Sequence, residues 1–252
     1  MILIRSYKRG IGRVYYEEEN PTVMFPSVTT ILNSTLAKGP WLDKWKLRIT
    51  REKFSELYEA AVLKESYQSI PAYDILDEAL AHPIKYRDNA GAVGNLIHKS
   101  IEAYLTDQPV DAYIAEDSRI KKVIKSVEAW ETKTQLEPID VECYIASKKY
   151  GFAGTVDVLA HQTTEHGKQL GLFDWKSGSI QNDALLQLAA YSVAFEETTG
   201  RRPDMAAFIK VDIEKGTIKE VEPKLSYHEI SQYFDLFLKA LSLWKWRTLK
   251  QF

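Results

Sequence analysis

Two acids and a lysine stand in neighbouring apolar segments and could perform acid–base or metal chemistry together. Asp174 and Lys176 lie two residues apart in the segment 170–176, so on a strand they would project from the same face. Burying an acid and a base at a strand end is costly unless they serve each other or a bound ion. Asp157 stands in the preceding apolar segment, after a glycine that permits close backbone approach. We therefore expect these three residues to share one site.

The two carboxylates favour a cation bound through oxygen. Mg²⁺ prefers oxygen ligands and keeps several waters, so Asp157 and Asp174 together with the phosphate oxygens of a substrate would complete its coordination. Such a cation can polarise a phosphodiester and generate hydroxide. Cys143 is the single cysteine and the five histidines are scattered, which excludes a zinc finger and a four-cysteine iron-sulfur cluster.

The sequence after residue 136 predicts a sheet crossed by one helix. Strands are expected over 139–145, 152–160, 170–176 and 205–211, with a polar loop over 161–168, a helix over 183–197, an edge strand ending near Val221, and a helix from Tyr227 that covers the sheet. The first three strands are expected to form an antiparallel meander. Because a strand-helix-strand unit is normally a right-handed crossover, the strand over 205–211 should lie parallel to that of Asp174.

The sequence before residue 136 predicts a hairpin over 1–20 and then helices. Apolar residues recur at three and four from residue 27 onward, with Asp74 and Asn89 as possible caps and Pro71 and Pro83 as breaks. We expect a mixed α/β fold with a central mixed sheet and an N-terminal helical region. The ranges 1–135 and 136–252 would form one compact unit.

Two local clusters of basic residues could bind nucleic acid. The net charge of the chain is −2, so the chain as a whole gives no attraction to phosphates. Trp41, Lys44, Trp45 and Arg48 recur at three and four, so on a helix they would present one aromatic and basic stripe. Basic side chains neutralise phosphates and aromatic faces stack on bases, which suits single-stranded nucleic acid. A second basic and aromatic stretch runs over 239–250. A solvated amphipathic helix is the alternative for both.

The sequence also predicts the cellular compartment, because it lacks two kinds of targeting segment. No apolar run is long enough for a membrane span, and the first residues do not form a signal peptide. We expect a soluble protein without a membrane partner, in the cytoplasm of a bacterial or phage-infected cell rather than in the mitochondrial matrix.

Several motifs in order resemble the PD-(D/E)XK nucleases of the RecB-like branch. They are Gly94-Asn95-Leu96-Ile97-His98 followed by Glu102 and Tyr104, then Gly154-Thr155-Val156-Asp157, Asp174-Trp175-Lys176-Ser177-Gly178, and Gln187 with Tyr191 one helical turn on. Further upstream, Pro26 to Leu32, Trp41 and Trp45 are similar to the opening of phage and mitochondrial genome-maintenance exonucleases. The resemblance spans residues 26 to 195, and its specificity lies in the ordered set.

The resemblance implies a restriction-endonuclease-like core and a set of site residues. The implied metal ligands are His98, Glu142, Asp157, Asp174 and the Trp175 carbonyl. Lys176 would orient the attacking water or stabilise the charge of the transition state. Gln187 and Tyr191 would support the site, and Glu102 could join it. The four-cysteine cluster of some relatives is absent, which argues against an iron-sulfur cluster.

The expected function is metal-dependent hydrolysis of DNA, with Mg²⁺ or substituting Mn²⁺, by an exonuclease that acts on single strands or free ends in replication, recombination or repair. A catalytically silent nucleic-acid-binding module and a structure-specific endonuclease are the alternatives.

Several of these residues could instead have a purely structural role. Gln187 and Tyr191 could be ordinary polar packing, His98 a satisfied core histidine, and Asp174 with Lys176 a solvated pair. Ser27 and Thr29 could bind phosphate or only cap the next helix.

Overall fold

The computed structural model describes residues 3–37, 39–63, 72–111, 114 and 116–248. The chain divides into two compact units, each described here by itself. The first, which we call the sheet unit, comprises Met1–Leu36 and Leu96–Phe252, and the second, the helical unit, comprises Ala37–Asn95. The expected division into 1–135 and 136–252 stays a prediction.

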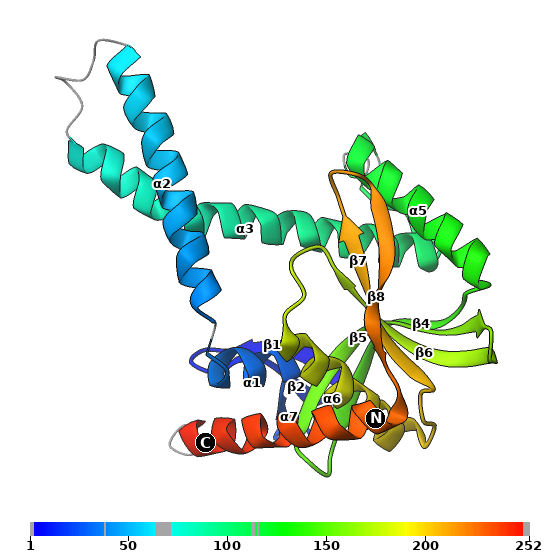
Figure 1. Ribbon diagram of the computed structural model, residues 1–252. Helices are drawn as coiled ribbons and strands as arrows, with labels where there is room; N and C mark the ends of the chain where they lie inside the picture. The colour runs from blue at the N-terminus through cyan, green and yellow to red at the C-terminus, as the bar shows by residue number, and fades with distance from the viewer. Residues whose placement is uncertain (1–2, 38, 64–71, 112–113, 115, 249–252) are drawn as a thin grey trace. The chain divides into compact units, whose positions relative to one another are not determined.

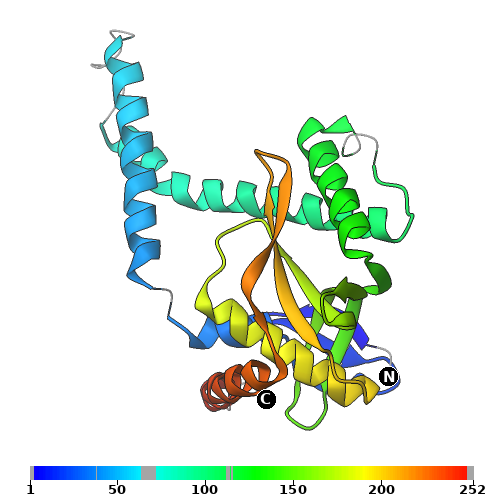
Figure 2. The ribbon, with the colours of Figure 1, turned by 45° about the vertical axis from the view of Figure 1, so that its right-hand side comes forward.

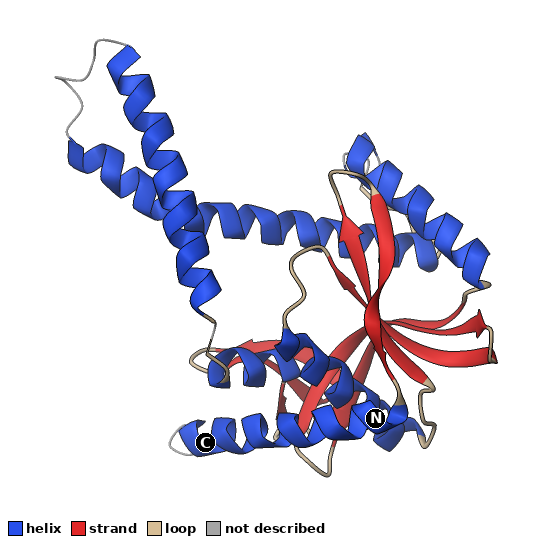
Figure 3. Ribbon diagram, in the orientation of Figure 1, coloured by secondary structure: helices blue, strands red, loops and turns tan. Residues whose placement is uncertain are grey.

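A five-stranded mixed sheet lies at the centre of the sheet unit (Figures 1 and 3). The order β4-β5-β6-β7-β8 joins β4 (Glu137–Ser147), β5 (Phe152–Thr164), β6 (Gly167–Lys176), β7 (Met205–Asp212) and β8 (Thr217–Leu225). β6 and β7 are parallel, and the other neighbours are antiparallel. The expected meander, crossover and edge strand are therefore confirmed, as is the mixed α/β fold class. The polar loop expected over 161–168 is wrong, because β5 continues to Thr164 and β6 begins at Gly167.

Helices cover both faces of this sheet. The crossover helix α6 (Asn182–Thr199) packs on the face of β6 that carries Leu170 and Leu172. Its run of alanines and leucines favours a helix, which ends at Gly200 in a left-handed conformation. α5 (Ser118–Thr134) covers the opposite face, where the Trp130 ring contacts the ring of Phe173.

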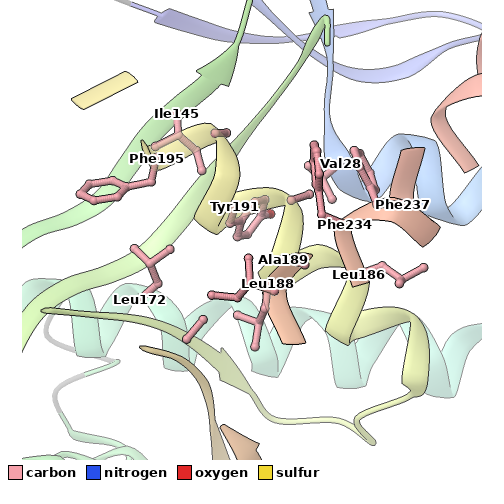
Figure 4. Packing of buried hydrophobic residues seen from close by; sticks show 14 of the residues in the cluster. Val28, Ile145, Leu172, Leu186, Leu188, Ala189, Tyr191, Phe195, Phe234 and Phe237 are labelled. Atoms are coloured by element: carbon pink, nitrogen blue, oxygen red, sulfur yellow. The ribbon is translucent and has the colours of Figure 1, made fainter. Parts of the chain in front are cut away.

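The C-terminal helix α7 (Tyr227–Thr248) runs beside α6 (Figure 2). It packs mainly on α6 and α1, and it reaches the sheet through Phe234 and Phe237, whose rings contact that of Phe152 in β5, and through contacts with β8. The prediction that this helix covers the sheet is thus correct for part of the face, because α6 lies on the same face. Figure 4 shows Phe234 and Phe237 of α7 beside Tyr191 and Leu188 of α6 in the shared core.

A small N-terminal sheet packs on β4 and β5. β1 (Leu3–Lys8) and β2 (Gly12–Glu17) form the expected hairpin, and β3 (Met24–Pro26) pairs with β2. Leu3, Tyr15 and Phe25 are buried against Ala146 and Ala153 of the larger sheet. Tyr15 and Thr155 share a buried hydrogen bond between their hydroxyls, 2.8 Å long. These contacts fix the hairpin beside the strand that carries Asp157.

The remaining helices correct one expectation. They are α1 (Val28–Thr35), α2 (Pro40–Leu63) and α3 (Ala72–Leu105), of which α2 and the first part of α3 belong to the helical unit. Pro83 and Asn89 were expected to end or cap a helix, but both lie inside α3. A proline removes one backbone hydrogen bond and can kink a helix without ending it. Asp74 lies in the first turn of α3, and Pro71 lies outside the described residues. No helix in the described ranges is both long and apolar enough to span a bilayer.

Candidate active site

The sheet unit brings eight of the predicted site residues together at neighbouring elements. They are His98 of α3, Glu142 of β4, Asp157 of β5, Asp174, Trp175 and Lys176 of β6, and Gln187 and Tyr191 of α6. The meander places β4, β5 and β6 side by side, and the crossover returns α6 over the same face. The fold therefore collects residues that are far apart in the sequence.

Asp157 is held in place by a backbone donor and a histidine. The Trp175 N–H donates to Asp157 Oδ2 over 2.8 Å, so the neighbouring strand orients this carboxylate. His98 Nδ1 lies 3.4 Å from the same oxygen. Burial acts to lower the pKa of His98, but the hydrogen bond and charge of Asp157, together with the charge of Asp174, outweigh it and raise that pKa.

Asp174 lies in a network built by α6. Gln187 Nε2 donates to Asp174 Oδ1 over 3.1 Å and to the Tyr191 hydroxyl over 2.9 Å, while Gln187 Oε1 accepts from Lys176 Nζ over 3.3 Å. The amide can make these bonds in only one orientation, because a flip would place its oxygen against the Asp174 carboxylate. Tyr191 can approach so closely because Gly154 has no side chain; a Cβ there would lie 2.3 Å from the Tyr191 ring.

Lys176 and Asp174 form a buried ion pair. Lys176 Nζ lies 2.6 Å from Asp174 Oδ2. Burial raises the pKa of Asp174 to about 6 although the Lys176 ammonium lowers it. Burial also acts to lower the pKa of Lys176, but the charge of Asp174 outweighs this and raises it. We infer that the lysine stays protonated while the carboxyl holds its charge only with difficulty.

Three side chains meet at a distance suited to one cation. Ligand atoms of His98, Glu142 and Asp157 all lie within 4.8 Å of one another. Asp174 is not one of the three, and its buried Oδ2 is paired with the Lys176 ammonium at 2.6 Å. Two carboxylates and an imidazole that converge in this way can bind one divalent cation, and carboxylates suit Mg²⁺ and Mn²⁺. The residues present thus fit a divalent cation.

Glu142 reaches this cluster through an unusual backbone conformation. Its φ of 54° lies in the left-handed region, which is rare for a residue with a side chain and costs stability. Burial, with the charges of Asp157 and Glu102, raises the pKa of Glu142. The Arg5 guanidinium lies 3.6 Å from its carboxylate. Glu102, half-buried on α3, is therefore close enough to act on the cluster, as its place in the predicted motif implied.

The other predicted contact residues lie elsewhere. Ser27 is the buried N-cap of α1, with its hydroxyl accepting from Thr30 N over 3.0 Å, and Thr29 lies in the first turn of that helix. This is the capping role that the sequence left open.

The predicted aromatic and basic stripe lies on α2 of the helical unit. Lys44 and Arg48 are exposed, and Arg48 pairs with Glu52. Trp41 is also exposed, while the Trp45 ring packs edge-on against Tyr86. The same division applies to the C-terminal stretch, where Trp244 is buried and Trp246 is exposed.

Lys210 is a residue near the site that the sequence interpretation missed. It lies directly opposite Lys176 on the parallel strand β7. Its Nζ donates to the carbonyls of Ser177 and Gly178, so it holds the loop that follows Lys176. A lone lysine in the apolar stretch Met205–Asp212 was the available signal, but its partners depend on strand register.

Comparison with known proteins assigns the family. The family model of the PD-(D/E)XK nuclease superfamily matches residues 62–245, which is most of the chain. The structure of an alkaline exonuclease (LHK-Exo) from Laribacter hongkongensis is similar at 14% identity and a TM-score of 0.29, over 57% of this chain and 78% of that chain. LHK-Exo in complex with dAMP gives 13% identity and the same TM-score and coverage. A search of curated proteins finds no significant match. The match over residues 62–245 shows that this chain belongs to the PD-(D/E)XK nuclease superfamily.

Proposed function

We propose that this protein is a Mg²⁺-dependent DNA exonuclease that hydrolyses phosphodiester bonds in single strands or at DNA ends. The observation that supports this best is the convergence of ligand atoms of His98, Glu142 and Asp157 within 4.8 Å of one another, together with the buried ion pair of Asp174 and Lys176. A role in replication, recombination or repair, in the cytoplasm of a bacterial or phage-infected cell, is part of the same proposal.

The geometry supports three ligands for the cation. His98, Glu142 and Asp157 would hold it through ligand atoms that lie within 4.8 Å of one another. The resemblance to the nuclease family adds Asp174 and the Trp175 carbonyl to this proposed set. A bound divalent cation supplies Lewis-acid chemistry, which polarises the phosphodiester and lowers the pKa of an attacking water. Mn²⁺ would substitute for Mg²⁺, because both accept carboxylate ligands.

Lys176 would act on the reacting atoms. The nearby charge of Asp174 keeps its ammonium protonated despite burial, and Gln187 Oε1 orients it over 3.3 Å. In this position Nζ can donate to the attacking water or to a phosphate oxygen, where it stabilises the negative charge that develops. Gln187 and Tyr191 would act through Asp174 and Lys176 as positioning residues.

The substrate preference rests on the helical unit. Trp41, Lys44, Trp45 and Arg48 lie on α2, and the exposure of Trp41, Lys44 and Arg48 supports contact with a single strand. Ser27 and Thr29 remain candidates for phosphate contact, although the Ser27 hydroxyl already caps α1.

An assay with labelled DNA tests the proposal. Linear single-stranded DNA labelled at one end should be degraded with Mg²⁺ or Mn²⁺ and left intact with EDTA. A circular single strand should survive, because an exonuclease needs an end. Cleavage of the circle would instead indicate an endonuclease. Binding without cleavage in any divalent cation would indicate a catalytically silent module and would overturn the proposal.

A further inference from the structure

We propose that one face of the β1–β2 hairpin binds the DNA strand next to the catalytic centre through Arg5, Tyr7 and Arg13. We call these three residues the hairpin face. The inference deepens the proposed function and rests on it, because it assigns a second contact surface to the same nucleic-acid substrate. None of the three belongs to the predicted metal or catalytic set.

Strand register places the three side chains together. Arg5 pairs with Tyr15 and Tyr7 pairs with Arg13 across the hairpin. Residues directly opposite each other share a face of an antiparallel pair, and so do residues two apart on one strand. Arg5, Tyr7, Arg13 and Tyr15 therefore project from one face. Tyr7 thus neighbours both arginines, with Arg13 directly opposite it and Arg5 two residues before it, and of the two tyrosines on this face only Tyr7 is exposed.

This face adjoins the candidate active site. Tyr15 at its inner end is buried, and its hydroxyl is bonded to Thr155, two residues before Asp157. Arg5 lies 3.6 Å from the Glu142 carboxylate, with its guanidinium 5.8 Å from the centre of the Tyr144 ring. The surface is therefore continuous with the residues proposed to hold the cation.

The outer part of the hairpin face carries exposed side chains that can bind a ligand. Tyr7 is 76% exposed, although it is a large aromatic residue. The Arg13 guanidinium and the Tyr7 side chain make no hydrogen bond or ion pair with any other described residue. The Arg5 side chain is 44% exposed, and among the described residues it contacts the Glu142 carboxylate and the Tyr144 ring. A guanidinium group carries five donors in a fork that matches phosphate oxygens.

Charge complementarity identifies the occupant. Glu102, Glu142, Asp157 and Asp174 give the catalytic centre four carboxyl groups, which repel a phosphate backbone wherever the cation does not neutralise them. Arg5 and Arg13 supply positive charge at the border of this acidic region, and Tyr7 supplies a ring on which a base can stack. Two phosphate contacts around one stacking ring fit a single strand.

Binding and cleavage measured on one set of variants test this inference. Fluorescence anisotropy with labelled oligothymidine in EDTA reports binding without cleavage. Arg5→Ala/Arg13→Ala should reduce the salt slope of log K by about 1.4, since each phosphate contact on a single strand contributes about 0.7. Tyr7→Ala should weaken binding about fivefold or more, whereas Tyr7→Phe should bind as the wild type because its ring remains.

A matched control removes the same charge from the far side of the sheet. Lys125 and Lys133 are exposed on α5, which covers the face of β6 opposite Asp174, so Lys125→Ala/Lys133→Ala should leave the slope unchanged. Thermal unfolding should show that all variants keep the wild-type Tm. If the wild type cleaves DNA but the arginine variant keeps the wild-type affinity and slope, the hairpin-face inference is wrong and the proposed function stands. If the wild type neither binds nor cleaves DNA, both fail.

Discussion

The role proposed for Lys176 separates catalysis from metal binding. Its Nζ contacts Asp174 and Gln187 but would donate no electron pair to a cation while it remains protonated. We expect Lys176→Ala to reduce cleavage of single-stranded DNA by at least about a hundredfold. Mn²⁺ affinity, measured by calorimetry, should stay close to that of the wild type. Cleavage within a few-fold of the wild type would show that the catalytic centre is assigned wrongly.

The two aspartates should behave differently from the lysine. Asp157→Asn and Asp174→Asn each replace an anionic oxygen with a neutral amide, which is a poorer ligand for a hard cation. Both variants should lose Mn²⁺ affinity in calorimetry as well as nuclease activity. Lys133→Ala on α5 serves as a control for the titration. Wild-type affinity in both aspartate variants would refute their assignment as ligands.

The raised pKa of Asp174 links metal binding to pH. Its pKa is about 6 in the folded protein against 3.8 in the unfolded chain, so the protonated carboxyl stabilises the metal-free fold below about pH 3.8. That contribution is lost as the pH rises through about 6. A cation stabilises the ionised carboxylate, and below this pKa it must first displace the proton.

We therefore expect Mn²⁺ to raise the Tm more at about pH 7.5 than at about pH 5. Thermal unfolding with and without Mn²⁺ at the two pH values measures the difference. In Asp174→Asn the dependence on pH should shrink. An equal rise in Tm at both pH values in the wild-type protein would contradict the expectation.

At the scale of the element, Glu142 places a strained backbone in the middle of β4. Glycine adopts positive φ without steric cost, so Glu142→Gly should relieve the strain and also remove a half-buried acid. In EDTA the Tm should rise by about 2–4 °C, which corresponds to about 1 kcal/mol in a chain of this size. Mn²⁺ affinity should fall in the same variant.

Asp140→Gly is the matched control for this prediction. Asp140 lies in the same strand without a positive φ, and glycine weakens a strand interior, so its Tm should fall. If Glu142→Gly loses as much stability as Asp140→Gly, the left-handed conformation carries no strain.

Elements were predictable where periodicity alone decides their type. The alternation after residue 139 and the alanine-rich segment after residue 182 predicted the meander and the crossover helix, and chain handedness then predicted parallel β6 and β7. Proline is unfavourable inside a helix, so the sequence predicted a break at Pro83. α3 nevertheless continues through this residue, because the hydrogen bonds of the neighbouring turns maintain the helix. The left-handed Glu142 was hidden for a similar reason: an alternating pattern does not reveal a local reversal of the backbone.

The candidate site could be proposed from residue types and spacing, whereas the contacts between its residues could not. Asp157, Asp174 and Lys176 were marked by residue type and spacing, and the structure gives each a partner. The contacts of Arg5 and Lys210 depend on which strands pair and in which register, which one sequence does not state. Long-range packing supplied these contacts.

At the scale of the whole molecule, the helical unit carries its own prediction. Lys44→Ala/Arg48→Ala should weaken single-strand binding and flatten its salt dependence, because fewer counterions are released. Trp41→Ala should cost about 1–3 kcal/mol of binding if a base stacks there. Trp45→Ala should also lower the Tm, because its ring packs on Tyr86.

Anisotropy titrations over a range of salt concentrations, with unfolding curves for each variant, measure these effects. If the basic double variant keeps wild-type affinity and slope while a tryptophan variant loses stability, the stripe is packing and solvent-exposed surface, and the DNA follows another path.

The hydrogen bond between Tyr15 and Thr155 joins residues that are 140 positions apart. Closing so long a loop costs chain entropy before the contact can form, and folds that depend on such pairings form slowly. During synthesis on the ribosome the β1–β2 hairpin emerges well before its partner strand β5, and Lys176, Gln187 and Tyr191 emerge later still. A growing chain therefore lacks the complete set of proposed catalytic groups until α6 has been made, and the proposed hydrolysis of DNA would begin only after that point.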